Sequence, residues 1–187
     1  MGKLLEQATR LHSLRRAWTL IRSNGLRSPL QETRDSIEIF ERDAEKHLSR
    51  IQTALRRGTF SFEPQKGIPK KKKSGGQRGI VMAPVANRVV ERALLNCLQE
   101  NIPFVQKVIN DPHSVGGVPD RSVPHGLALV TNAFEQNKRY FVRADISGFF
   151  DHIPRLDVLQ TLEKHIHDEA VMEVLRKATT VTLANEV

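Results

Sequence analysis

The sequence has almost no cysteine and no long apolar run. Cys97 is its single cysteine, so neither a disulfide framework nor a cysteine zinc site can form within the chain, and a reducing cytoplasm is the expected compartment. His165 and His167 are two residues apart, which on a helix directs them to different sides and makes them a poor metal pair. No stretch resembles a membrane span or a signal peptide, so we expect no membrane partner.

Acidic residues are also in short supply. The 187 residues include 29 Lys and Arg but only 21 Asp and Glu, which gives a net charge of +8. A chain this basic commonly meets an anionic partner, and nucleic acid is the first candidate. The alternative is that the charge serves only to keep the protein in solution. Hydrophobic residues make up 39% of the chain, which is enough for a packed core.

The first third of the chain predicts helices. Residues 4–21 read as a basic helix, and residues 23–31 read as a loop because of their Asn-Gly pair and proline. Asp35 and Glu38 have the spacing of a capping box, and Gly58 suits a left-handed helix stop. A single apolar helical face is predicted between them, made of Ile37, Phe40, Ala44, Leu48, Ile51 and Leu55.

The remainder of the chain mixes strands with helices. Residues 59–64 alternate like a short strand, and residues 66–84 predict two strands around a turn rich in lysine and glycine. Residues 140–146 give the strongest strand pattern. Helices are predicted over residues 85–98, 127–134, 156–165 and 170–178. Because strands and helices do not alternate regularly, we expect an α+β fold.

The segment "RADISGFFDHI" carries the residues best suited to chemistry. Asp145 follows the expected buried strand, where a carboxylate is costly unless a partner such as a divalent metal pairs with it. Mg²⁺ prefers oxygen ligands, and the backbone carbonyl of Ile146 offers a second one. Gly148 permits close approach of a substrate to the backbone. The alternative is that Asp145 ends the strand, Asp151 caps the next helix and the intervening aromatics are core.

This segment resembles the first palm motif of reverse transcriptases, especially bacterial ones of the group II intron, retron and phage-defence types. "IPKKKKSGGQRGIVMAP" resembles their fingers motif, and "NRVVERALLNCL" resembles the helix that follows it. "SVGGVPDRS" is similar to a loop of group II-like enzymes, and "TNAF" is similar to an Asn-Ala pair of retron enzymes. The resemblance runs from about Asp35 to about Ile153, and the order and spacing of its motifs make it specific.

The resemblance implies a role for individual residues. Asp145 would be a catalytic Mg²⁺ ligand, with the carbonyl of Ile146 serving a second metal. Phe150 would be the aromatic gate beneath the sugar of the incoming dNTP. Arg78 would lie across its triphosphate, assisted by Lys70 or Lys71. Further nucleic-acid contacts are expected from Lys72, Lys73, Arg88 and Arg121. For the lysine run, the alternative is a solvated charged turn.

Two features depart from the family pattern. Val115, Gly117 and Val118 stand where the family usually has an aromatic, a Phe and an Arg. The later family motifs, namely the Gln-Gly segment, the Tyr-x-Asp-Asp pair and the thumb, have no counterpart before Val187. Two-metal phosphoryl transfer needs carboxylates besides Asp145. We therefore expect the 187 residues alone to be inactive.

The resemblance thus implies the N-terminal portion of an RNA-directed DNA polymerase. Residues 1–34 would be a basic extension, residues 35–138 a fingers-like region and residues 139–187 an incomplete palm. The partners would be an RNA template, a DNA or RNA primer and dNTP, with the missing palm and thumb in the same chain or in a partner chain. The alternative is a non-catalytic nucleic-acid- or partner-binding derivative. Retron synthesis, intron mobility, antiviral defence and diversity generation remain equal alternatives for the biological role.

Overall fold

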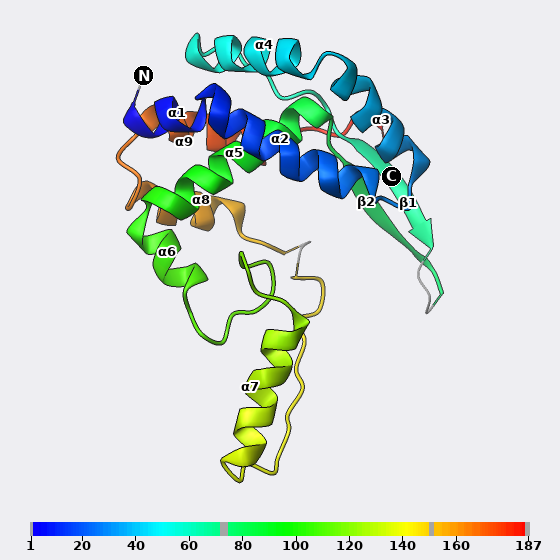
Figure 1. Cartoon of the computed structure of the whole chain (residues 1–187), viewed down its shortest axis with the longest axis vertical. Coiled ribbons are helices and arrows are strands. Elements are labelled where there is room, and N and C mark those ends of the chain that lie inside the picture. The colour runs from blue at the N-terminus through cyan, green and yellow to red at the C-terminus, as the bar shows by residue number, and fades with distance from the viewer. Residues whose placement is uncertain (1, 72–74, 150–151, 186–187) are drawn as a thin grey trace.

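The computed structural model describes residues 2–71, 75–149 and 152–185. It combines a body of packed helices with an antiparallel β-hairpin on one side and a projecting arm (Figure 1). The elements are α1 (Lys3–Ala8), α2 (Leu11–Leu26), α3 (Gln31–Arg42), α4 (Ala44–Arg56), β1 (Lys66–Lys71), β2 (Gln77–Met82), α5 (Val85–Asn101), α6 (Pro103–Ile109), α7 (Val123–Glu135), α8 (Arg155–Glu163) and α9 (Glu169–Thr179). This mixture of helices with a small sheet confirms the α+β prediction.

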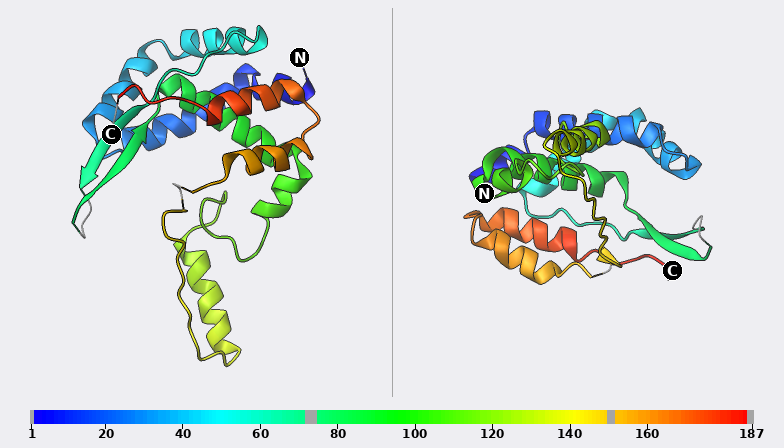
Figure 2. Two further views of the ribbon diagram at one scale, coloured as in Figure 1. Left: turned by 180° about the vertical axis from the view of Figure 1, so that it is seen from behind. Right: turned by 90° about the horizontal axis from the view of Figure 1, so that it is seen from below.

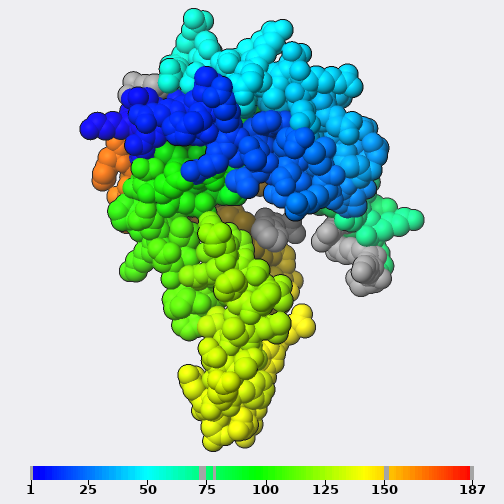
Figure 3. All heavy atoms as spheres, in the orientation of Figure 1, coloured from blue at the N-terminus to red at the C-terminus, as the bar shows by residue number. Residues whose placement is uncertain are grey.

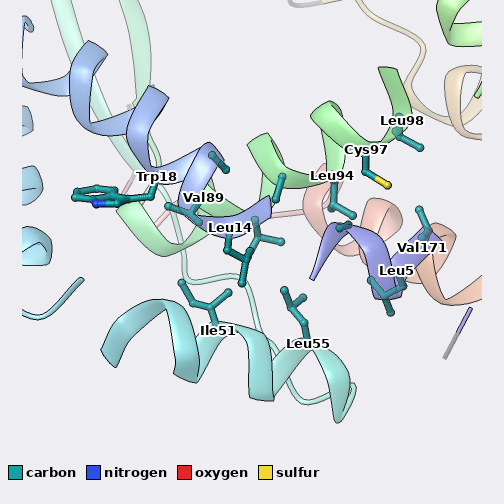
Figure 4. Close-up of a cluster of buried hydrophobic side chains, with 14 of the residues drawn as sticks. Leu5, Leu14, Trp18, Ile51, Leu55, Val89, Leu94, Cys97, Leu98 and Val171 are labelled. Atoms are coloured by element: carbon teal, nitrogen blue, oxygen red, sulfur yellow. The ribbon is translucent and has the colours of Figure 1, made fainter. Parts of the chain in front are cut away.

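Helix α5 lies at the centre of the body. The apolar pattern of residues 85–98 predicts this helix, and its residues Val89, Val90 and Ala93 are almost completely buried. Helices α1, α2 and α9 pack directly against α5, and α4 also contacts it. Figure 4 shows Leu14 of α2, Val89 of α5 and Ile51 of α4 in one continuous cluster. Burial of these side chains from several helices is the main source of stability in the body.

The N-terminal helix is interrupted, and its end lies later than the sequence predicts. Chain direction changes at Thr9 and Arg10, which separates α1 from α2. Helix α2 then continues through the Asn-Gly pair to Leu26, so the loop prediction for residues 23–31 is wrong at its start. Gly25 is buried within α2. A Cβ at this position would lie only 2.4 Å from Cγ1 of Ile37, so no larger residue fits without a shift. This glycine allows α2 and α3 to pack closely.

The next predicted helix is also divided in two. Asp43, at φ −130° and ψ 33°, separates α3 from α4. The predicted apolar face is nevertheless buried, with Ala44 only partly so. The capping-box prediction is wrong because α3 already begins at Gln31, and Asp35 accepts a hydrogen bond from Nε2 of Gln31 at 2.6 Å. Gly58 adopts φ +69°, which confirms the left-handed stop.

Residues 59–64 do not form the predicted strand. Phe60 and Phe62 contact each other edge to face at 5.1 Å and pack against the core. The amide of the fully buried Asn87 holds Glu63, accepting from its N–H at 3.1 Å and donating to its carbonyl at 2.8 Å. A side chain of α5 thus supplies the backbone hydrogen bonds that a neighbouring strand would otherwise provide.

The hairpin forms as predicted. Strands β1 and β2 pair antiparallel from Lys66 opposite Met82 to Lys71 opposite Gln77. The C-terminal segment pairs with the chain at the base of the hairpin, where Asn185 exchanges two hydrogen bonds with the backbone of Gly67 (Figure 2). These contacts fix the base of the hairpin against the body, and its two strands run outward from there to Lys71 and Gln77.

Residues 123–149 form the arm, in which α7 is followed by an extended segment that runs back alongside it (Figures 1 and 3). The strand prediction for residues 140–146 is wrong. This segment is extended but unpaired, and the side chains of Tyr140 and Val142 are 98% and 89% exposed. A strand needs the backbone of a neighbour, and the described residues place none beside this segment.

None of the described helices is long and apolar enough to cross a membrane.

Candidate nucleic-acid and nucleotide site

The segment around Asp145 lies on the surface of the arm. Asp145 is exposed, and Ile146 is 69% exposed. The chain turns at Gly148, which has φ +61° and whose carbonyl lies 2.8 Å from Nδ1 of His152. The expectation of a buried carboxylate at a strand end is therefore wrong, because the strand that would bury it has no partner among the described residues.

The aromatic pair behind Asp145 is described only in part. Phe149 is 50% exposed, so it is not the core residue expected from the predicted strand. Phe150, the predicted sugar gate, and Asp151, the predicted helix cap, lie outside the described residues. The assignment of Phe150 stays a prediction.

The described residues do not by themselves form a metal centre. They contain no group of three or more His, Cys, Asp or Glu side chains placed to hold a metal ion. Asp145 offers one carboxylate, and two acidic side chains of the C-terminal region are engaged elsewhere. Asp168 caps two helices, and Glu169 pairs with Arg176 at 2.6 Å. A site for Mg²⁺ at Asp145 would need carboxylates from outside the described residues.

The hairpin presents cationic side chains near its tip. Lys70 and Lys71 are exposed at the end of β1, where they lie opposite Arg78 and Gln77 in the register. Lys72 and Lys73 lie outside the described residues. Exposed lysines on a projecting hairpin can approach a phosphate backbone without disturbing the core.

The two remaining candidate arginines have different surroundings. Arg88 is partly buried on α5, and burial lowers its pKa while the nearby Glu91 carboxylate opposes that change. Burial also raises the pKa of Glu91. Arg121 donates from Nη1 to the carbonyls of Asp111 and Ser114, the latter at 2.6 Å, and so braces the loop before α7. Arg121 has a structural task besides any contact with phosphate.

The candidate residues are distributed over the hairpin, α5, the loop before α7 and the arm. Within the described part of the chain, no hydrogen bond or ion pair joins Asp145 to Lys70 or Lys71. The structure therefore presents separate surfaces that a nucleic acid or a further polypeptide would have to bring together. Their joint role as one site stays a prediction.

Sequence reasoning missed two residues on which this arrangement depends. Asp168, buried between α1 and α9, has a recognisable signal because it directly precedes an apolar helical pattern with Glu169 in its first turn. Asn87 fixes the approach to the hairpin through its amide. Nothing in the sequence marks it, because its partner lies 24 residues away.

Comparisons with known proteins show a distant relationship to two longer proteins. The chain is 25% identical over 131 residues to an uncharacterized 91 kDa protein in a cob intron of Schizosaccharomyces pombe. It is 26% identical over 133 residues to the protein YkfC of Escherichia coli. These alignments include 70% and 68% of this chain, but only 16% and 33% of the respective relatives. No protein-family model matches the chain. The chain is thus similar to part of an intron-encoded protein.

Proposed function

We propose that this chain is the N-terminal portion of a protein related to reverse transcriptases, which binds an RNA template, its primer and dNTP. The order and spacing of the motifs between about Asp35 and Ile153 carry this proposal. Similarity to a protein in a cob intron supports the proposal, because the reverse transcriptases that the motifs resemble include those of group II introns. The hairpin with exposed Lys70 and Lys71, in a chain of net charge +8, also supports it.

In this proposal, Asp145 is one ligand of a catalytic Mg²⁺ ion. When bound, the ion would stabilise the charge of the transferring phosphoryl group. The remaining carboxylates would come from a continuation of this chain or from a partner chain. The exposed position of Asp145 on the arm leaves it accessible to such a polypeptide.

The test compares Asp145→Asn with Asp157→Asn in the protein that includes the polypeptide supplying the later motifs. Asn keeps the size of the side chain but removes the charge on which Mg²⁺ binding depends. We expect Asp145→Asn to reduce primer extension by more than about 100-fold, since even loss of a supporting partner typically costs 10- to 100-fold. Asp157 is exposed on α8, and its substitution should leave extension within about twofold.

The melting temperatures of both variants should match that of the parent protein, because both side chains are exposed. Extension by Asp145→Asn within about tenfold of the parent rate, or about 1.4 kcal/mol in barrier, would refute the metal assignment. The 187-residue chain by itself serves as the baseline, and we expect no template-dependent extension from it.

A second candidate function is nucleic-acid or partner binding without catalysis. The exposed Lys70 and Lys71 of the hairpin favour this alternative, because lysines can contact phosphate without a metal ion. It predicts that the parent protein binds a primed RNA template but extends the primer under no metal condition. The same primer-extension assay with Mg²⁺ or Mn²⁺ therefore separates the two functions.

A further inference from the structure

The outer face of α4 carries an open groove of about 390 Å³. Helix α4 turns Leu48, Ile51 and Leu55 into the body, which leaves its opposite face to solvent. The groove follows that exposed face, and α4 lies along an edge of the molecule from which the strands of the hairpin run away (Figures 1 and 3). Its polar lining consists of three cations, Lys46, Arg50 and Arg57, and three hydroxyl residues, Ser49, Thr53 and Thr59.

The end of α4 forms one wall of the groove. Gly58 adopts φ +69°, a conformation that favours glycine, and turns the chain back directly after Arg57. Thr59 then donates its backbone N–H to the carbonyl of Ala54 at 2.9 Å. This turn holds Thr59 beside the last turn of the helix, so the wall is fixed by the helix stop itself.

No carboxylate neutralises the groove. The sequence from residue 46 to residue 62 contains neither Asp nor Glu. Glu45, just before it, is engaged by Arg15, whose Nε donates to it at 2.9 Å. Within residues 2–71, 75–149 and 152–185, no ion pair includes Lys46, Arg50 or Arg57.

The arginines of the neighbouring helix are placed differently. Arg15, Arg16 and Arg22 of α2 each pair with a carboxylate of another helix. In the groove, by contrast, Lys46 and Arg50 are four residues apart on α4, a spacing at which like charges destabilise a helix. The groove therefore keeps a positive charge that the fold compensates elsewhere, and an anionic partner would relieve the repulsion.

The row of cations has the length and chemistry to follow a phosphate backbone. Lys46 and Arg57 are eleven residues apart, which at the rise of an α-helix separates them by roughly 16 Å. One strand of B-DNA carries a phosphate about every 3.4 Å along the axis, so a row of this length spans several phosphates. Arginine, lysine, serine and threonine are the residues that commonly donate to phosphate oxygens.

The lining also discriminates between anionic partners. It contains no aromatic side chain on which an unpaired base could stack, and Ala54 is its only apolar residue, so it lacks the apolar face of a membrane-binding helix. Double-stranded RNA displays 2′-hydroxyls, which both donate and accept, in a wide and shallow minor groove. The hydroxyls of Thr53 and Thr59 donate to helix carbonyls and retain lone pairs that accept from a 2′-hydroxyl.

We propose that this groove on α4 binds the backbone of double-stranded RNA, with the phosphates on Lys46, Arg50 and Arg57 and the 2′-hydroxyls beside the serine and threonine residues. The groove adds a second RNA-binding surface to the proposed function. It does not depend on Asp145 or on catalysis, because it involves no metal ion and no nucleotide.

The test measures the fluorescence anisotropy of a labelled blunt RNA duplex of about 16 base pairs, a length that a double-stranded RNA-binding domain spans. The chain carries Lys70→Gln and Lys71→Gln, which weakens contacts from the hairpin and defines the reference protein. We expect the reference protein to bind with a Kd below about 10 μM at about 150 mM salt. Addition of Arg50→Gln and Arg57→Gln should weaken binding at least tenfold.

The matched control adds Lys107→Gln and Lys164→Gln to the reference protein. These substitutions remove the same charge from exposed positions outside the groove, and should change Kd less than threefold. Both variants should keep the melting temperature of the reference protein, because all four side chains are exposed. Should the groove variant fail to fold, Arg50→Gln alone takes its place, with an expected loss of at least threefold.

Two further ligands check the identity of the partner. A DNA duplex of the same sequence lacks the 2′-hydroxyls and should bind at least threefold more weakly than the RNA duplex. Vesicles that contain phosphatidylserine should not bind, because the groove offers no apolar face.

The proposal is overturned if the reference protein shows no saturable binding of the RNA duplex up to about 100 μM. Equal weakening by the groove variant and the control variant, equal affinity for the DNA duplex, or vesicle binding that the groove substitutions abolish would each overturn it as well. None of these outcomes bears on primer extension by Asp145→Asn, so failure of this proposal is distinct from failure of the proposed function.

Discussion

At the residue scale, one buried carboxylate joins the first helix of the chain, α1, to the last, α9. Oδ2 of Asp168 accepts hydrogen bonds from the backbone N–H groups of Leu4 at 2.9 Å and Leu5 at 3.3 Å, at the start of α1. Oδ1 accepts from Val171 at 3.3 Å, at the start of α9. A carboxylate at a helix N-terminus satisfies free N–H groups and interacts favourably with the helix dipole. Asp168 does so for two helices at once.

We predict that Asp168→Ala lowers the free energy of unfolding by about 2–3 kcal/mol, because it leaves buried N–H groups at two helix starts without an acceptor. Urea denaturation monitored by circular dichroism measures this change. Asp43→Ala is the matched control, since Asp43 precedes α4 but its side chain makes no capping hydrogen bond. The control should stay within about 0.5 kcal/mol of the parent. Equal effects of the two substitutions would contradict the double-cap interpretation.

At the scale of elements, two glycines within helices differ in how much space a side chain would have. A Cβ on Gly25 of α2 would lie 2.4 Å from Cγ1 of Ile37, whereas a Cβ on Gly126 of α7 would lie 3.4 Å from its nearest neighbour, Cγ2 of Val115. Alanine is favoured over glycine in helices by about 1 kcal/mol. Packing therefore decides the sign of the effect at each position.

We predict that Gly25→Ala destabilises the protein by about 1–3 kcal/mol despite its gain in helix propensity, because α2 and α3 must separate. Gly126→Ala should leave the unfolding free energy unchanged or raise it by up to about 1 kcal/mol. Thermal unfolding of both variants, measured in the same buffer, compares them directly. A stabilising Gly25→Ala would show that α2 and α3 do not pack as closely as the structure describes.

Sequence patterns predicted well the elements whose apolar residues recur at a regular helical spacing. The apolar faces of α4 and α5 repeat every three or four residues, and the structure buries them as expected. The helix breaks at Thr9 and Asp43 were missed because apolar periodicity continues across them. The strand at residues 140–146 was predicted from β-branched and aromatic residues, yet strand formation depends on a neighbouring backbone that no local pattern reveals.

The same distinction applies to the candidate site. Local patterns predicted the hairpin and its exposed Lys70 and Lys71, because a turn between two alternating strands is a local feature. The surroundings of Asp145 could not be predicted, since they depend on whether a neighbouring backbone pairs with residues 140–146, and the described residues place none there.

At the scale of the whole molecule, the apolar surface is distributed unevenly. The body buries most of its large apolar side chains, although Ile39 and Leu156 are 62% and 73% exposed. The arm buries none of its own, and it exposes Leu127 by 61%, Phe141 by 73% and Val142 by 89%. Exposed apolar surface of this extent commonly marks an interaction site. The hairpin projects from another part of the body and carries charge instead (Figure 1). We therefore propose that the arm contacts a partner and that the hairpin contacts phosphate.

The charged extension yields a prediction about salt dependence. We expect the chain to bind RNA or an RNA–DNA hybrid with little sequence preference, and each lysine that contacts phosphate contributes about 0.7–0.9 to the slope of log K against log salt. Replacing Lys70 and Lys71 together by Gln should therefore reduce that slope by about 1.5.

The matched control replaces Lys107 and Lys164 in the same way. These two lysines are exposed near α6 and α8, on the far side of the body from the hairpin (Figure 1). It removes the same charge and should change the slope by less than about 0.5. Fluorescence anisotropy between about 50 and 200 mM salt measures all three proteins. Equal slopes for the two double variants would mean that net charge alone attracts the nucleic acid, and that Lys70 and Lys71 form a solvated turn.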